Sequence, residues 1–168
     1  MILFAQIAVF FFLFILQTSV LRMYASIAPD TALLATAWFA LRYGRYGGLD
    51  SGVLGGLLQD VASFGMMGIN LLSKGVIGLL VGWLKENHLI EWNSVISWII
   101  TIGAGTFING LIFRNYAMSF FDYHPGLLGD IGQMSLQALY NLAVGLPLFS
   151  FLIALETKMR RLLNIREA

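Results

Sequence analysis

Two glycine-rich apolar segments follow one another in residues 48–82, GLDSGVLGGLLQDVASFGMMGINLLSKGVIGLLVG. Glycines recur every three or four residues in both segments and so share one face of each predicted helix: Gly48, Gly52, Gly56, then Gly75, Gly78 and Gly82. Small residues at this spacing let two helix backbones approach closely within a lipid bilayer. Residues 65–68, GMMG, separate the segments and predict a turn. The stretch therefore predicts a closely packed helical hairpin.

The composition of the whole chain assigns this hairpin to a membrane. Of the 168 residues, 58% are hydrophobic and only 11% are charged, and the mean hydropathy is +0.80. About a quarter of the residues in a soluble domain are charged, so this chain has too few polar groups to cover a water-soluble surface. It contains no cysteine, which excludes a disulfide framework, thiol catalysis and Cys-ligated metal. The formal net charge of +1 gives no indication of nucleic-acid binding.

Hydropathy predicts an all-α integral membrane protein with one domain, residues 1–168, that forms a six-helix transmembrane bundle. About 20 helical residues cross the hydrocarbon layer of a bilayer. The first span is read as retained, because it is longer than the core of a signal peptide and no Lys or Arg precedes it. The second is short for a full crossing and starts after Pro29, while Pro147 is expected to kink the sixth. The expected spans are residues 2–21, 30–43, 49–64, 70–84, 92–113 and 133–155, followed by a basic tail, residues 157–168.

The distribution of basic residues predicts the orientation of this bundle. With six spans both termini lie on one side, and the opposite side carries only Arg22 and Arg114. Positive charge accumulates in cytoplasmic loops, so both termini are expected in the cytoplasm. The basic residues on that side are Arg42, Arg45, Lys85, Lys158, Arg160, Arg161 and Arg166.

Two ionisable residues, Asp60 and Lys74, lie well inside the expected spans. Charged groups at membrane depth are costly and indicate either a functional site or a structural pair. The two residues lie at similar distances on either side of the turn at residues 65–68, so they are expected to pair. Such a pair either pins the hairpin or forms a polar centre that holds a partner or substrate. Gln59 and Asn70 offer further hydrogen bonds.

Other polar residues near or within the spans have simpler expected roles. Asp50 is expected to form an interfacial salt bridge with Arg42 or Arg45. Asp30 follows a proline at a helix start, where a carboxylate is favoured by the helix dipole. Asn109 and Asn141 are expected to form interhelical hydrogen bonds, which are of modest strength in membranes.

No catalytic or metal-binding motif emerges from the sequence. The two histidines, His88 and His124, fall in loops expected on opposite sides of the membrane. Residues 126–130, GLLGD, lack the Gly-x-Gly-Asp element of an intramembrane aspartyl protease. We therefore expect neither an enzyme nor a cofactor.

Four segments in the first half of the chain resemble the family of rod shape-determining membrane proteins called MreD. Its pattern is a short proline-opened helix ending in a basic-Gly turn, a glycine-rich helix closing on Gly-Leu-x-x-Asp, and a Gly-x-x-Gly-like turn. The matching segments here are residues 29–34, PDTALL, residues 41–44, LRYG, residues 52–60, GVLGGLLQD, and residues 65–70, GMMGIN. The length and the six-span hydropathy also match, whereas residues after 82 match by hydropathy alone.

The resemblance implies a non-enzymatic membrane scaffold of the bacterial cell-elongation machinery, in the cytoplasmic membrane. The implied partners are MreC, a bitopic protein with an extracytoplasmic coiled coil, together with MreB, RodA, a penicillin-binding transpeptidase and membrane lipid; a homodimer is also compatible. The implied fold is similar to the S components of energy-coupling-factor transporters. Asp60 corresponds to the family's aspartate, whereas Lys74 matches no family feature. The candidate partner-binding or structural residues are Gly52, Gly56, Asp60, Gly65, Lys74, Gly78 and Gly82.

Two other classes remain open from the sequence. A substrate-binding S component of a vitamin-type transporter would use a pocket near Asp122, His124, Asp130 and Tyr140. It would usually present an Ala-xxx-Ala face on its first helix, whereas Ala5 and Ala8 here are three apart. A small oligomeric channel or permease is compatible with the charges at membrane depth, but no repeated pore-lining stripe is present.

Overall fold

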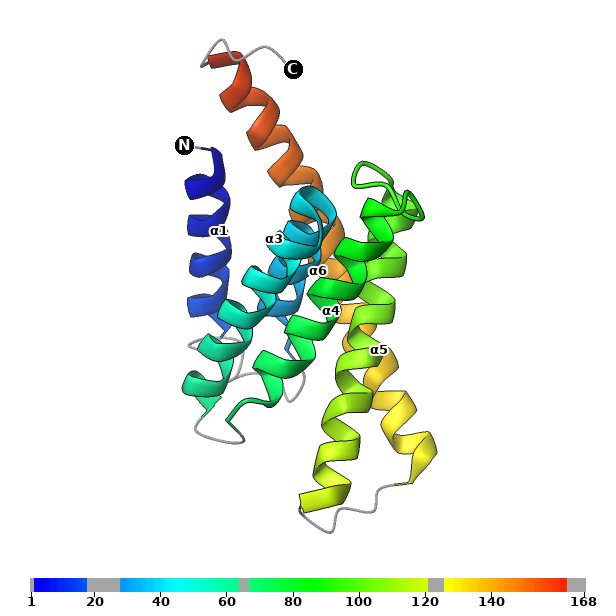
Figure 1. The fold of residues 1–168 in the computed structure, drawn as a ribbon. Helices are drawn as coiled ribbons and strands as arrows, with labels where there is room; N and C mark the ends of the chain where they lie inside the picture. Colours follow the sequence, from blue (N-terminus) through cyan, green and yellow to red (C-terminus); the bar gives the residue numbers. More distant parts are fainter. Residues whose placement is uncertain (1, 18–27, 64–66, 121–125, 163–168) are drawn as a thin grey trace.

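The computed structural model describes residues 2–17, 28–63, 67–120 and 126–162, and these parts contain five helices. The start of α1 and the end of α6 lie at the same end of an elongated bundle (Figure 1). The helices are α1 (Ile2–Leu16), α3 (Thr31–Ser63), α4 (Ile69–Glu86), α5 (Val95–Phe120) and α6 (Leu127–Leu162).

Helix α3 is two antiparallel arms joined at one residue. Gly44 has φ 79° and ψ −163°, outside the helical region, and separates residues 31–43 from residues 45–63. Side chains with Cβ atoms rarely adopt this positive φ, whereas glycine does so without penalty. The arms then lie against each other, because a Cβ added at Gly55 would be 3.2 Å from the Cβ of Ala32. The second and third expected spans therefore correspond to the two arms.

Two of the described helices are long and apolar enough to cross a membrane. These stretches are Val95–Phe120 in α5 and Leu127–Arg161 in α6. The all-helical class is confirmed, whereas the six crossings expected from hydropathy are not all shown. Helix α1 has 15 residues and is shorter. Charged residues such as Asp50, Asp60 and Lys74 interrupt the apolar stretches of α3 and α4.

The last two helices extend beyond their expected bounds. Helix α6 ends at Leu162, so residues 157–162 of the expected basic tail are helical. Helix α5 continues to Phe120 and α6 already begins at Leu127, so most of the polar stretch expected as a loop is helical. An ion pair explains part of this extension, because Arg114 of α5 meets Asp130 of α6 at 2.9 Å. Pro147 lies within α6, which remains one helix through it.

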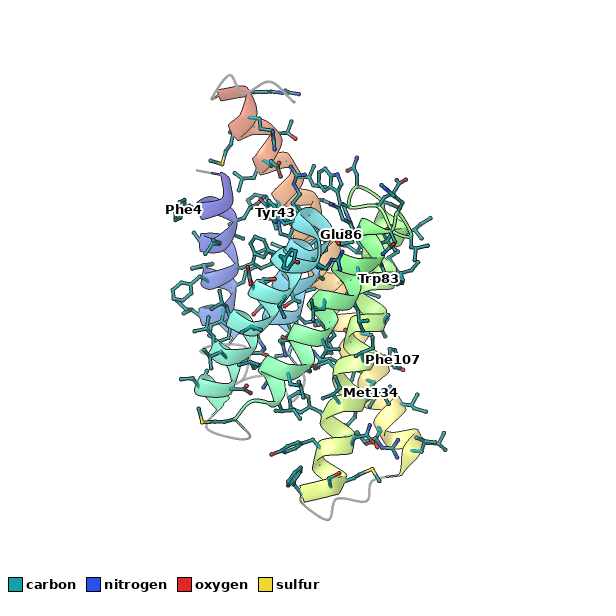
Figure 2. All side chains as sticks on the ribbon, in the orientation of Figure 1. Phe4, Tyr43, Trp83, Glu86, Phe107 and Met134 are labelled. Atoms are coloured by element: carbon teal, nitrogen blue, oxygen red, sulfur yellow. The ribbon has the colours of Figure 1, made fainter. Side chains whose placement is uncertain are left out.

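The core surrounds the first arm of α3. Trp38 packs edge-on against Phe149 at 5.2 Å between ring centroids, and Trp98 packs against the same ring at 5.7 Å. Large apolar side chains also cover the outside of the bundle, where Phe4 and Trp83 project outward (Figure 2). An apolar exterior of this kind is unusual for a water-soluble protein and suits a protein surrounded by lipid.

Candidate functional site

A buried polar network joins the start of α3, the second arm of α3, and helices α4 and α6. At its centre is Lys74, whose side chain is fully buried. The Lys74 Nζ lies 3.1 Å from Asp30 Oδ2 and donates a hydrogen bond of 2.8 Å to Asn70 Oδ1. A buried ammonium is tolerated only when charge and hydrogen-bond partners replace water, and both are present here.

Asp30 connects four parts of the bundle. Its Oδ1 accepts from the backbone N–H of Leu33 at 3.0 Å, the geometry of a helix N-cap, and from Gln59 Nε2 at 2.8 Å. Its own N–H donates to Asn141 Oδ1 at 2.7 Å. The carboxylate therefore combines the helix-start role expected from the sequence with the role of counterion to Lys74.

Asp60 caps the start of α4 instead of pairing with Lys74, which corrects the expected ion pair. Its carboxylate accepts from the backbone N–H groups of Gly68, Asn70 and Leu71 at 2.9–3.2 Å, and from Asn70 Nδ2 at 2.9 Å. The first N–H groups of a helix have no intrahelical partner, and an acceptor there satisfies them. Asn70 links the two charged groups, because its amide bonds Asp60 on one side and Lys74 on the other.

The two glycine stripes face each other across the second arm of α3 and α4. A Cβ added at Gly48 would collide with the backbone of Gly78, and a Cβ at Gly52 would collide with the backbone of Lys74. At Gly56 the obstructing atoms belong to Asn70 and Leu71, and at Gly82 to Gly44 and Arg45. The stripes thus meet within the chain, as the predicted hairpin requires. Gly65 lies outside the described residues.

Charged residues also pair at the end of the bundle where Tyr43 and Glu86 lie (Figure 2). Arg42 meets Glu156 at 2.5 Å and stacks over the Trp92 ring at 4.5 Å, and Arg160 meets the same carboxylate at 2.8 Å. Arg45 meets Glu86 at 2.5 Å. A backbone hydrogen bond from Arg45, together with one from its side chain, holds the pKa of Glu86 below its usual range.

These pairs correct the salt bridge expected at Asp50. Both candidate cations, Arg42 and Arg45, bind glutamates of other helices. Asp50 itself is exposed on the second arm of α3. Of the other residues expected to form a basic surface, Lys85 is half-buried and Arg161 is exposed.

The region proposed for a transporter pocket contains a small cavity. Its volume is about 240 Å³, and Arg114, Asp130, Gln133 and Met134 are among its lining residues. Met134 is labelled in Figure 2. Arg114 Nε and Asp130 Oδ2 are close enough for an ion pair, but the N–H is not aligned for a hydrogen bond. Tyr140 is exposed and is not part of the lining. Asp122 and His124 lie outside the described residues.

The interhelical hydrogen bonds expected of two asparagines are confirmed. Asn109 accepts from Ser73 Oγ at 2.7 Å, and Asn141 Nδ2 donates to Thr106 Oγ1 at 2.9 Å. Sequence reasoning missed Glu156, which is buried although it carries charge. The spacing to Arg160, four residues later on the same helix face, could have predicted an ion pair with Glu156.

Comparison of the chain with known protein families, with curated proteins and with solved structures found no match. The function is therefore argued from the polar network and the bundle themselves.

Proposed function

We propose that this chain is a non-enzymatic membrane scaffold of the bacterial cell-elongation machinery, as its resemblance to the MreD family implies. The observation that supports this proposal is the closure of the polar network. Its charged groups bind one another and the backbone, which is the arrangement expected of a rigid platform. A catalytic or transport centre would instead present charged groups toward a substrate.

The contacts of the network show how its charges are engaged. Both oxygens of Asp30 are occupied, one by Lys74 and the other by Leu33 and Gln59. Asp60 accepts four hydrogen bonds from the turn and the start of α4. The network therefore supplies a reason for charged residues at membrane depth that needs no ligand.

The full topology that we propose has six crossings, a fold similar to the S components and both termini in the cytoplasm. Successive helical segments run in alternating directions between the two ends of the bundle, counting the arms of α3 separately (Figure 1). Local packing compensates for the short first arm, because residues 31–43 are almost all buried within the protein. The excess of Lys and Arg at one end supports the cytoplasmic placement of both termini.

In this role the chain binds MreC and works beside MreB, RodA and the penicillin-binding transpeptidase. Lys85 and Arg161 lie at the proposed cytoplasmic end and are suited to contact anionic lipid. Scaffolding requires a fixed surface rather than a moving one. The paired glycine stripes and the saturated ion pair provide that stiffness.

A second candidate, a substrate-binding S component, is favoured by the cavity at Arg114 and Asp130. An imperfectly aligned ion pair in a cavity is suited to bind a small polar ligand at the proposed extracytoplasmic end. The volume of about 240 Å³ is small for such a ligand, since ligand pockets usually measure about 300–1,000 Å³.

Purification in native-membrane nanodiscs from the host, followed by mass spectrometry of the co-purifying proteins and small molecules, separates these candidates. Recovery of a bitopic coiled-coil protein with a transpeptidase or glycosyltransferase supports the scaffold. Recovery of a coupling subunit with two ATPases, or of a bound vitamin that is lost in Asp130→Asn, refutes it and supports the transporter subunit. Gln133→Ala, another cavity-lining change, controls for ligand loss through altered cavity shape alone.

A further inference from the structure

A lateral groove of about 380 Å³ is lined by residues of α1 and of the two arms of α3. Phe10, Phe11 and Phe14 of α1 form one wall, and Leu54 and Leu58 of the second arm contribute to the other. The groove is separate from the buried network, because Lys74 and Asp60 are not among its lining residues. Its walls are almost entirely apolar, as expected of a surface that meets lipid or another helix.

One polar group in the groove has no partner of its own. Ser51 donates to the backbone of Gly48, Tyr43 donates to Gln6, and Thr31 donates to Gln17. Asp50 also lines the groove, and among the described residues no donor or cation lies within bonding distance of its carboxylate.

The position of Asp50 makes this lack of a partner significant. It lies six residues beyond the reversal at Gly44, which corresponds to about 9 Å along the arm. If the bundle spans the bilayer as proposed, the carboxylate faces the hydrocarbon boundary, where an unpaired charge is costly. A neighbouring molecule that supplies a positive charge at this depth would remove much of that cost.

We propose that the groove seats a single transmembrane helix of the bitopic partner, with a Lys or Arg of that helix paired to Asp50. This inference rests on the proposed function, because it takes the scaffold's bitopic partner to be the occupant. Residues of α1 and α3 hold the apolar side of the partner helix, and Asp50 fixes its depth and register. Cytoplasmic ends of bitopic helices are rich in Lys and Arg, which places the required charge near the same end.

Charge distinguishes this occupant from two others. Acyl chains can fill the apolar part of the groove, but they offer no cation, and anionic lipid headgroups would repel the Asp50 carboxylate. A second copy docked through the same groove about a twofold axis would bring two Asp50 carboxylates toward each other. A partner helix with a basic residue satisfies both the apolar walls and the carboxylate.

Cysteine crosslinking tests the seat directly, because the chain has no cysteine of its own. Leu54→Cys and Leu58→Cys point into the groove, whereas Leu57→Cys and Tyr46→Cys are exposed on the same arm outside it. Each variant is combined in membranes with single cysteines scanned along the partner's transmembrane helix. We expect crosslinks from positions 54 and 58, recurring every three or four residues along the partner, and none above background from positions 57 and 46. Equal crosslinking from both pairs, or crosslinks only between copies of this chain, would overturn the inference.

The ion pair is tested by Asp50→Asn, which keeps the shape of the side chain and lies on an exposed surface. Polar contacts between transmembrane helices correspond to a roughly threefold to twentyfold change in affinity, so partner binding should weaken by that factor. Exchanging the charges, with Asp50→Lys here and Asp at the matching partner position, should restore it. Unchanged binding by Asp50→Asn overturns the inference, provided that the wild-type chain recovers the partner. Failure of the wild type to recover any bitopic partner overturns the proposed function and this inference together.

Discussion

Replacing Lys74 by methionine removes a charge from the most enclosed part of the bundle. The lysine side chain is fully buried, and its ammonium meets Asp30 at 3.1 Å. Methionine preserves much of the apolar stem, so the change chiefly leaves Asp30 without its counterion. Removing one member of a buried ion pair costs about 3–5 kcal/mol, because the remaining charge stays buried. Since Leu33 and Gln59 still donate to Asp30, we expect a loss of about 3 kcal/mol.

Thermal unfolding in a mild detergent, followed by tryptophan fluorescence, measures this loss. At this chain length 1 kcal/mol shifts Tm by about 2–4 °C, so Lys74→Met should lower Tm by about 6–12 °C. Leu72→Met, on the exposed side of the same helix, is the matched control and should change Tm little. Lys74→Met combined with Asp30→Asn should recover part of the loss, because the pair then becomes neutral. A Tm near wild type for Lys74→Met, or strict additivity of the two changes, would refute the reasoning.

Three further predictions concern the packing and the caps. Gly52→Ala should lower the free energy of unfolding by at least about 1–3 kcal/mol, because the added Cβ would collide with the backbone of Lys74. Gly103→Ala, which has open space around the added atom, should be neutral or slightly stabilising, and the Tm values of the two variants are compared. Asp60→Asn should cost about 1–3 kcal/mol through weakened capping of α4 and lower the yield of folded protein, and a normal yield and Tm would contradict the capping role. Glu86→Gln should lower Tm at neutral pH, and this difference should shrink only as the pH falls below 4.5 and through the lowered pKa of Glu86, where the carboxylate is protonated and its stabilising contribution is lost. A Tm difference independent of pH would argue against it.

The hairpin of α3 and α4 was predictable because glycine spacing reports close backbone contact directly. Small residues every fourth position leave room that only another backbone can fill, and Gly52 and Gly78 indeed face the opposite helix. The reversal at Gly44 was harder to place, since the sequence offers glycines at 44, 47 and 48. Only the structure shows that the positive φ falls at the first of them.

The partner of Lys74 could not be predicted from depth alone. The turn at residues 65–68 places Asp60 at a similar level, but it leaves unspecified which way the carboxylate faces. The free N–H groups of α4 compete for Asp60, and Asp30 approaches from an arm that is distant in sequence. Ion pairs between distant segments depend on which helices become neighbours in the bundle, and the spacing of residues along the sequence does not specify those neighbours.

Asp50 illustrates the same limit at the end of the bundle. Arg42 and Arg45 are near it in sequence, yet both turn toward glutamates of other helices. Glu156 lies 114 residues from Arg42, so only the fold brings the two together.

The single-residue reversal at Gly44 also constrains how the protein is made. The first arm of α3, residues 31–43, is about 20 Å long at 1.5 Å per residue, which is too short to cross a hydrocarbon layer of about 30 Å unaided. In the proposed topology no loop separates it from the second arm, so the two arms are expected to insert as one unit. Asp30 gains its counterion Lys74 only when α4 lies beside them. We therefore expect insertion of the two arms to be coupled to insertion of α4.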